Sequence, residues 1–312
     1  MSSGDVMTDR IINGRFVVGS KQISEFALIT YFCMPMIRLL FSWIGLDFVK
    51  YPATFIITYF PLVIVIVSST NARKKFAEFL ILVIYLALFL GITLTVHPDY
   101  SYWYTRETYG VLPYIFRPDN GIYAFLLIRL IDDPDTILKD LRFSGWIMYI
   151  FYLRQLMNAL SRGYWVIEAH NGAESHLSYS LDFGYNVMFF ALVFLYLSLR
   201  DKKPTDIIAS IIGIGMCLVG GSRGSILCIG AFVIIYLMIN LQQSRRKFLY
   251  IAAIGIFAFL LFYFYEPILL FSANILERFG LPSRFIYKLL SGSISDGTGR
   301  DKIWEAAIEM IR

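Results

Sequence analysis

Hydrophobic residues along this chain gather in long continuous runs, which are separated by short polar segments. A helix that crosses a bilayer needs about 20 mainly apolar residues, whereas the strands of a membrane barrel alternate apolar and polar positions over shorter segments. The pattern therefore predicts an all-α, polytopic transmembrane helix bundle with about nine spans. The predicted runs are 26–46, 53–69, 76–96, 111–131, 143–160, 185–199, 207–219, 226–241 and 248–271.

The fourth run differs from the others because a polar segment, Arg117-Pro118-Asp119-Asn120-Gly121, interrupts it. Only a short clean helix ending near Arg129 remains after the interruption. We therefore expect a broken or re-entrant helix here, with the freed backbone groups satisfied inside the protein. A crossing is still required, because the later basic clusters then all lie on one side of the membrane.

The distribution of Lys and Arg predicts the topology. Of the 22 that precede residue 272, 14 fall in the amino-terminal segment and in four short connections, 71–75, 132–142, 200–204 and 244–247. The positive-inside rule places these segments, including the amino terminus, in the cytoplasm. We predict one integral membrane domain over residues 1–312, with 272–312 as an extracytoplasmic loop. The first part of that loop, 273–290, is amphipathic and is expected to lie along the membrane surface.

Composition supports a membrane protein and excludes several other classes. The chain is 57% hydrophobic and 16% charged, whereas soluble proteins carry roughly a quarter charged residues. The net charge of +5 does not indicate a nucleic-acid partner, because the basic residues sit between apolar runs. Cys33, Cys217 and Cys228 lie in or beside apolar segments. Their spacing predicts no metal site, disulfide or redox cofactor.

The first candidate site is a polar loop between two apolar runs, Gly220-Gly221-Ser222-Arg223-Gly224-Ser225. Glycines allow the backbone to approach a ligand closely, and a helix starting near Ser225 would present free N–H groups beside the Arg223 guanidinium. This combination suits a phosphate or diphosphate. The alternative is a plain transmembrane hairpin whose arginine reaches the lipid headgroups.

A second candidate site lies near the end of the chain. Thr298 and Asp301 have the spacing of an N-cap and its N3 partner, so a helix is expected to start near Thr298. Arg300 would then lie in the first turn, beside unpaired N–H groups and on the same predicted side as Arg223. Alternatively, Arg300 pairs with Asp296 and the Ser-Gly segment is only a connector.

The two arginine elements together resemble a known family. The loop Gly220-Gly221-Ser222-Arg223-Gly224, followed two crossings later by Gly297-Thr298-Gly299-Arg300-Asp301-Lys302-Ile303-Trp304, resembles the O-antigen ligase and polysaccharide polymerase superfamily. Segment 178–184 is similar to the exopolysaccharide and capsule polymerases of that group. By this resemblance, Arg223 and Arg300 match the family's two arginines. Members usually continue with further membrane helices, so the sequence is expected to be truncated at its carboxyl end relative to the family.

The resemblance implies a GT-C-like membrane glycosyltransferase that needs no metal or other cofactor. It would act at the outer face of the cytoplasmic (inner) membrane and transfer sugars from an undecaprenyl-diphosphate-linked oligosaccharide to a sugar hydroxyl. A diphosphate leaving group develops negative charge, which two arginines and helix N-termini can stabilise. Candidates for the proton acceptor are Asp296, Asp301, Glu305, Glu168, His170 and His176; candidate substrate contacts are Gly221, Ser222, Gly224, Thr298, Trp304, Arg154 and His170.

Three arginines, Arg38, Arg129 and Arg154, lie inside predicted apolar runs. Arg154 lies in the middle of a predicted span, where a charge costs about 2.5 to 3.5 kcal/mol on insertion scales. We therefore expect it to face the bundle interior with a partner or a ligand. For Arg38 and Arg129 a structural role is expected.

The leading hypothesis is a polysaccharide polymerase whose partners are membrane lipid, the lipid-linked donor, and chain-length regulator and flippase proteins. A ligase that moves finished glycan to a lipid or protein acceptor is the nearest alternative. A lipid-linked oligosaccharide transporter or a non-catalytic assembly subunit would also need basic residues. Transporters usually show repeated halves, and no internal repeat is seen in the sequence.

Overall fold

The computed structural model of the protein describes residues 19–106, 110–119, 121–162, 164–168, 174–177, 180–219, 223–243, 265–278 and 308. The chain divides into two compact units. Unit 1 comprises Met1–Phe151 with Ala169–Asn171, and unit 2 comprises Tyr152–Glu168 with Gly172–Arg312. The prediction of a single membrane domain stays a prediction.

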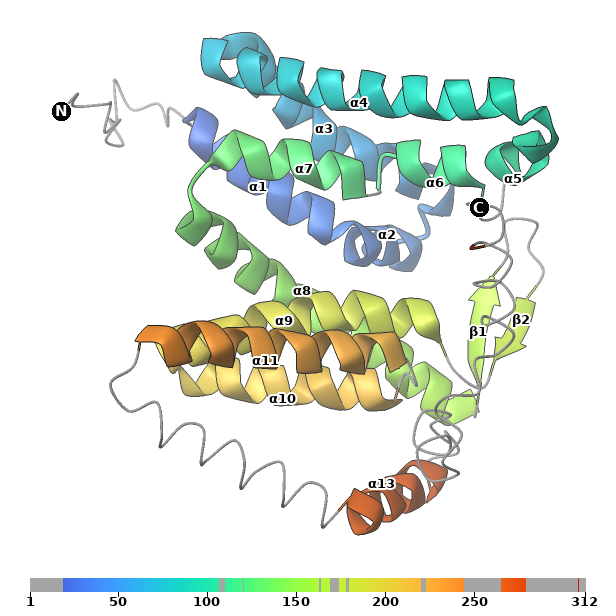
Figure 1. The fold of residues 1–312 in the computed structure, drawn as a ribbon, viewed down its shortest axis with the longest axis vertical. Helices are drawn as coiled ribbons and strands as arrows, with labels where there is room; N and C mark the ends of the chain where they lie inside the picture. Colours follow the sequence, from blue (N-terminus) through green and yellow to red (C-terminus); the bar gives the residue numbers. More distant parts are fainter. Residues whose placement is uncertain are drawn as a thin grey trace. The chain divides into compact units, whose positions relative to one another are not determined.

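Unit 1 is helical throughout its described residues (Figure 1). Its elements are α1 (Ser20–Phe32), α2 (Met34–Trp43), η1 (Asp47–Val49), α3 (Lys50–Ser68), α4 (Thr70–Val96), η2 (Pro98–Tyr100), α5 (Ser101–Thr105), α6 (Val111–Phe116), α7 (Gly121–Ile131) and the first part of α8 (Pro134–Arg162).

The first predicted run, 26–46, is not one continuous helix. It forms α1 and α2, which are bent by 70° at Cys33. Pro35 lies in the first turn of α2, and a proline cannot donate the backbone hydrogen bond that would continue α1. The predicted run 26–46 is therefore part of a bent pair of helices that together have the length and composition of one span, and the proline is the physical reason for the bend.

The core of unit 1 forms where α1 packs against α3 and α7. Leu28 is fully buried and Leu127 is 1% exposed. Around them lies a cluster that also includes Ala27, Tyr31, Met34, Leu62, Phe79, Leu126 and Ile131. Burial of such apolar side chains contributes about 1.5 to 3 kcal/mol for each large residue. This packing holds the amino-terminal helix against the later ones.

The predicted break in the fourth run is confirmed, since α6 and α7 are separate helices. Tyrosine hydroxyls satisfy two carbonyls at the break: Tyr59 donates to Pro118, and Tyr123 donates to Phe116 at 3.1 Å. Arg38 pairs with Asp119 at 3.0 Å. Carbonyls freed by a broken helix need such partners in apolar surroundings. Arg38 therefore has the structural role that was expected of it.

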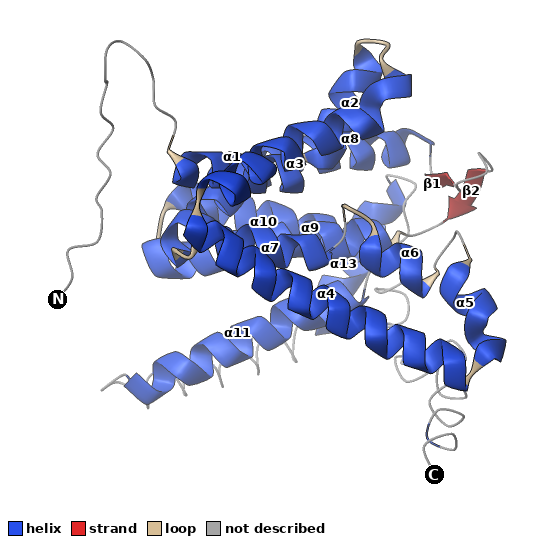
Figure 2. Cartoon of the chain, turned by 90° about the horizontal axis from the view of Figure 1, so that it is seen from above, coloured by secondary structure: helices blue, strands red, loops and turns tan. Residues whose placement is uncertain are grey.

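Unit 2 contains helices and one β-hairpin. Its elements are the remainder of α8, β1 (Trp165–Glu168), β2 (Glu174–Leu177), α9 (Leu181–Asp201), α10 (Pro204–Val219), α11 (Arg223–Gln243) and α13 (Tyr265–Arg278). The two strands, red in Figure 2, pair antiparallel with Trp165 opposite Leu177. The hairpin lies between the predicted spans 143–160 and 185–199 and adds two strands to an otherwise all-α fold.

Three described helices are long and apolar enough to cross a membrane: Asp47–Ser68, α4 and α9. The bent pair α1 and α2 would be a fourth span. Helices α7 and α10 and the segment Gly224–Ile239 are shorter apolar helices. These features support a membrane protein, while the arrangement of nine spans stays a prediction.

Two further predicted runs differ from the helices observed. Run 143–160 lies within α8, which is long enough to span a membrane but not apolar enough, because polar residues such as Arg154, Gln155 and Asn158 interrupt it. Most of run 248–271 lies outside the described residues. Its end continues without interruption into the predicted amphipathic segment, since α13 covers both. Pro267 lies in the first turn of α13, a position that tolerates proline.

One buried carboxylate in unit 1, that of Asp140, has an oxygen atom to which no described residue donates a hydrogen bond. Asp140 on α8 is 3% exposed, and its Oδ2 has no hydrogen-bond partner among the described residues. Burial, together with the nearby Glu25 carboxylate, raises the pKa of Asp140 to about 6, although Lys139 and Lys21 oppose this shift. The protonated form of Asp140 is therefore the one that the folded chain accommodates best.

This shift predicts how stability depends on pH. The contribution of Asp140 to the free energy of unfolding is fully present below its ordinary pKa of 3.8 and is lost as pH rises through about 6. Asp140→Asn should therefore stabilise the protein at pH 7.5, by at most ~3 kcal/mol, and should have little effect near pH 4. Thermal unfolding in detergent across this pH range measures the effect. Asp135→Asn, an exposed control on the same helix, should give no such gain.

Candidate functional site

The first candidate loop leads directly into α11. The helix begins at Arg223, two residues earlier than the predicted start near Ser225. The expectation that a helix follows the glycine loop is confirmed, but Arg223 belongs to the helix and not to the loop. In the first turn of a helix the backbone N–H groups have no intrahelical acceptor. Arg223 therefore lies where the chain offers free donors and the positive end of the helix dipole.

Gly224 allows α11 to approach α9 closely. A Cβ atom placed on Gly224 would lie 2.1 Å from the hydroxyl oxygen of Tyr185 and 2.8 Å from its Cζ atom. No side chain fits at that distance without movement of the tyrosine. The glycine that sequence analysis assigned to close approach of a ligand therefore has a structural task, which is to let Tyr185 pack over the first turn of α11.

Helices α9, α10 and α11 pack against one another, and the first turn of α9 lies at the same end of these helices as the start of α11. Ser180 caps α9, with its hydroxyl oxygen accepting a hydrogen bond from the Phe183 N–H at 3.2 Å. The Cys217 thiol, near the end of α10, donates to the Gly184 carbonyl at 3.6 Å. Together with the contact between Gly224 and Tyr185, these bonds bring the starts of α9 and α11 together. Two positive helix ends therefore meet at one place.

Aromatic side chains pack beneath the start of α9. The rings of Trp165 and Phe183 are 4.6 Å apart, and Tyr152 contacts Phe183 edge-on at 6.0 Å. Trp165 is buried, and its Nε1 has no hydrogen-bond partner among the described residues. The hairpin is thereby attached to α9 through its first residue. Sequence reasoning missed this packing, although the run Trp165-Val166-Ile167 carries the β-branched and aromatic signal of a strand.

Arg154 is placed differently from the prediction. It is exposed on α8, whereas Tyr152 and Ala159 are buried. Residues two positions apart point to nearly opposite sides of a helix, because each residue turns the helix by about 100°. The burial of Tyr152 therefore turns Arg154 outward, and the expectation that it faces the interior is wrong.

The whole second arginine element, 297–304, lies outside the described residues, and two other candidates lie in the hairpin. Glu168 and His176 lie in β1 and β2, where Glu168 pairs with Glu174 and His176 with Val166. The structure therefore tests the first arginine element only in part and does not test the second. Outside the described residues lie Gly221, Ser222, His170, Asp296, Thr298, Arg300, Asp301, Trp304 and Glu305.

Neither a metal site in the described part of the chain nor a known relative assigns a function to this chain. No group of three or more His, Cys, Asp or Glu side chains that could hold a metal ion occurs among the described residues. No family model matches the chain, and no match was found among curated proteins or solved structures.

The close approach at Gly224 generates a direct test. Gly224→Ala should lower stability by about 1 kcal/mol, because the new methyl group displaces the Tyr185 ring. In a Tyr185→Ala background the same change should be neutral or stabilising, since alanine is the better helix former. Thermal unfolding of the four proteins gives the coupling between the two sites.

Gly230→Ala is the matched control, because it lies on the same helix and a Cβ atom there meets nothing within 4 Å. It should not destabilise. An equal effect of Gly224→Ala with and without Tyr185 would contradict the packing described above.

Proposed function

We propose that this protein is an integral-membrane polysaccharide polymerase. It joins oligosaccharide repeat units carried on undecaprenyl diphosphate, at the outer face of the cytoplasmic membrane. The observation that supports the proposal is the position of Arg223 in the first turn of α11, at the meeting point of two helix N-termini. The resemblance of the two arginine elements to the polymerase and ligase superfamily supplies the reaction.

In the proposed reaction the protein stabilises developing negative charge, and it forms no covalent bond to the sugar and transfers no electrons to it. The hydroxyl oxygen of an acceptor sugar attacks the anomeric carbon of the donor, and the bond between that carbon and the diphosphate oxygen breaks. The bonding electrons leave with the diphosphate, and the hydroxyl proton passes to a base. Arg223, Arg300 and the N–H groups at the start of α11 would stabilise the departing charge. The base is one of the candidates named from the sequence.

A polymerase must hold the lipid diphosphate at the membrane while the sugar end remains accessible. A site at the end of apolar helices suits this requirement, because the polyprenyl chain can stay in the bilayer beside them. In unit 2, α9 is long and apolar enough to cross, and its Tyr185 side chain contacts Gly224, the residue after Arg223. As a polymerase, the protein would work with a chain-length regulator and a flippase, the partners expected from the resemblance.

The test is incorporation of a synthetic undecaprenyl-diphosphate repeat unit into polymer by the full-length protein in liposomes, with a chelator present. Wild type should make polymer, whereas Arg223→Ala and Arg300→Ala should each reduce it by at least about a hundredfold, as expected when a donor to a developing oxyanion is removed. The readout is polymer length and amount on a gel.

Arg278→Ala is the control, because Arg278 is an exposed arginine in the last turn of α13. It should leave polymer formation unchanged. Equal polymer from the wild type and both test variants would contradict the assignment of the arginines. Transfer to an added lipid acceptor without polymer would instead indicate a ligase.

A further inference from the structure

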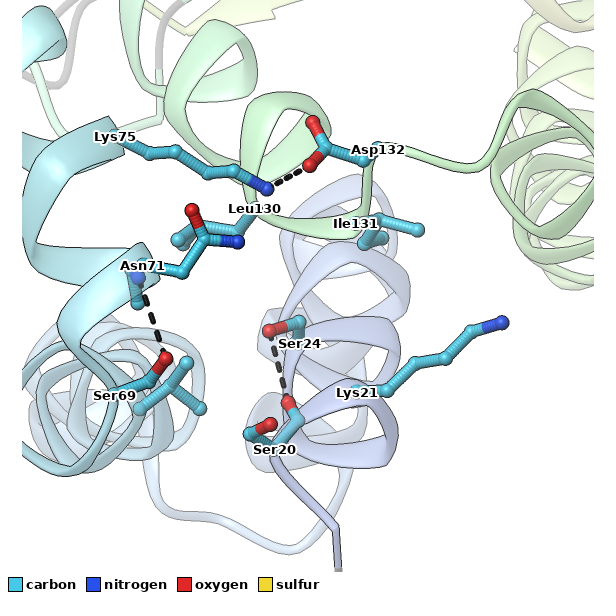
Figure 3. Close-up of a pocket in the computed structure, with 11 residues that line it drawn as sticks. Ser20, Lys21, Ser24, Ser69, Asn71, Lys75, Leu130, Ile131 and Asp132 are labelled. Atoms are coloured by element: carbon cyan, nitrogen blue, oxygen red, sulfur yellow. Dashed lines mark hydrogen bonds and ion pairs between the residues drawn. The ribbon is translucent and has the colours of Figure 1, made fainter. Parts of the chain in front are cut away.

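Unit 1 contains a polar cavity that the proposed function does not use. It has a volume of about 190 Å³ and lies between the start of α1, the start of α4 and the end of α7 (Figure 3). Liquid water occupies about 30 Å³ per molecule, so the space is large enough for a phosphate group and several waters. The distribution of basic residues predicts that this end of the unit faces the cytoplasm.

Hydrogen-bond donors converge on this cavity from two helix starts. Ser69 caps α4 by accepting from the Ala72 N–H at 3.4 Å, which leaves other first-turn N–H groups of α4 without intrahelical acceptors. Helix α1 starts at the same cavity, with Ser20 in its wall. Figure 3 also shows the amide of Asn71 pointing into this space. The lining therefore combines two positive helix ends with neutral donors.

Lys75 supplies a buried positive charge to the same wall. It is only 8% exposed and forms an ion pair with Asp132, which follows the last turn of α7. Asp132 has a second cation nearby, because its Oδ1 lies 3.8 Å from Nη1 of Arg129. Lys75 could therefore turn to another anion without leaving Asp132 unpaired.

The other lysine of the lining contributes less. Lys21 pairs with Asp133 at 3.5 Å, and Figure 3 shows its side chain extending away from the cavity. The described lining contains one carboxylate, that of Asp132, against two lysines and two helix N-termini. This balance favours an anion over a cation as the occupant.

We propose that this cavity binds a phosphate group. Lys75 exchanges its partner Asp132 for the phosphate, while Asp132 stays with Arg129, and the N–H groups at the start of α4 complete the binding. The phosphate can belong to a membrane lipid whose headgroup enters from the bilayer surface, or it can be inorganic phosphate. This proposal does not depend on polysaccharide synthesis.

The experiment measures ligand binding to the delipidated, purified full-length protein by native mass spectrometry. The probes are inorganic phosphate, phosphatidic acid, and diacylglycerol with the same acyl chains, which differs from phosphatidic acid only by the missing phosphate. Wild type should bind phosphatidic acid or inorganic phosphate but not diacylglycerol. Binding of phosphatidic acid alone assigns the site to lipid, and binding of inorganic phosphate assigns it to the free ion.

Two variants with opposite expected effects make the test specific. Lys75→Gln should weaken binding about tenfold, as loss of a charge-assisted hydrogen bond does. Lys74→Gln removes the same charge from an exposed neighbour and should bind as wild type does. Asp132→Asn should bind several-fold more tightly, because it removes the competing carboxylate.

Asp132→Asn is also the control for misfolding, because a misfolded protein would not bind phosphate more tightly. Asp132 has a positive φ of 62°, and asparagine tolerates this left-handed conformation well. The proposal is overturned if wild type binds neither phosphate probe, if diacylglycerol binds as well as phosphatidic acid, or if Asp132→Asn weakens binding. Equal binding by the Lys75→Gln and Lys74→Gln variants would also overturn it.

Discussion

The constraint on which this structure depends is that backbone polar groups in apolar surroundings must find partners. Where the fourth run breaks, the hydroxyls of Tyr59 and Tyr123 satisfy the exposed carbonyls. At the starts of α4 and α9, Ser69 and Ser180 each accept one of the first N–H groups. The remaining first-turn N–H groups of a helix are free to bind an anion. The two proposed binding sites use this property, one at the start of α11 and one at the starts of α1 and α4.

Charges inside apolar segments obey the same constraint. Arg38 pairs with Asp119 across unit 1, and Arg129 pairs with Glu78 at 2.7 Å. Breaking one partner of such a pair leaves an uncompensated charge, which is costly where water is excluded. These arginines therefore hold helices together, whereas Arg223 lies at the start of α11. Position relative to the helix ends separates structural arginines from candidate functional ones.

Apolar periodicity and length predicted much of the helical framework. The helices at α3, α4 and α9 follow directly from continuous apolar runs, and the break in the fourth run follows from its polar insertion. The bend at Cys33 was missed because Pro35 stands within an otherwise apolar run. The direction of Arg154 was missed because hydropathy does not report which side of a helix is buried. Only the packing of Tyr152 determines that side. For the candidate site, the sequence predicted a helix start near Ser225, two residues from the observed start, but not the contact of this helix with α9, which depends on tertiary packing.

The central claim of this account is that the two arginine elements form one diphosphate site. The most direct measurement is cross-linking of Ser222→Cys with Thr298→Cys by a short bifunctional maleimide in a Cys228→Ser background. That background is suitable because Cys33 and Cys217 are buried and Cys228 is exposed. Our account predicts an efficient intramolecular cross-link that a lipid-diphosphate donor suppresses. If both cysteines react with a single-ended maleimide but never cross-link, the two elements are apart and the claim is wrong.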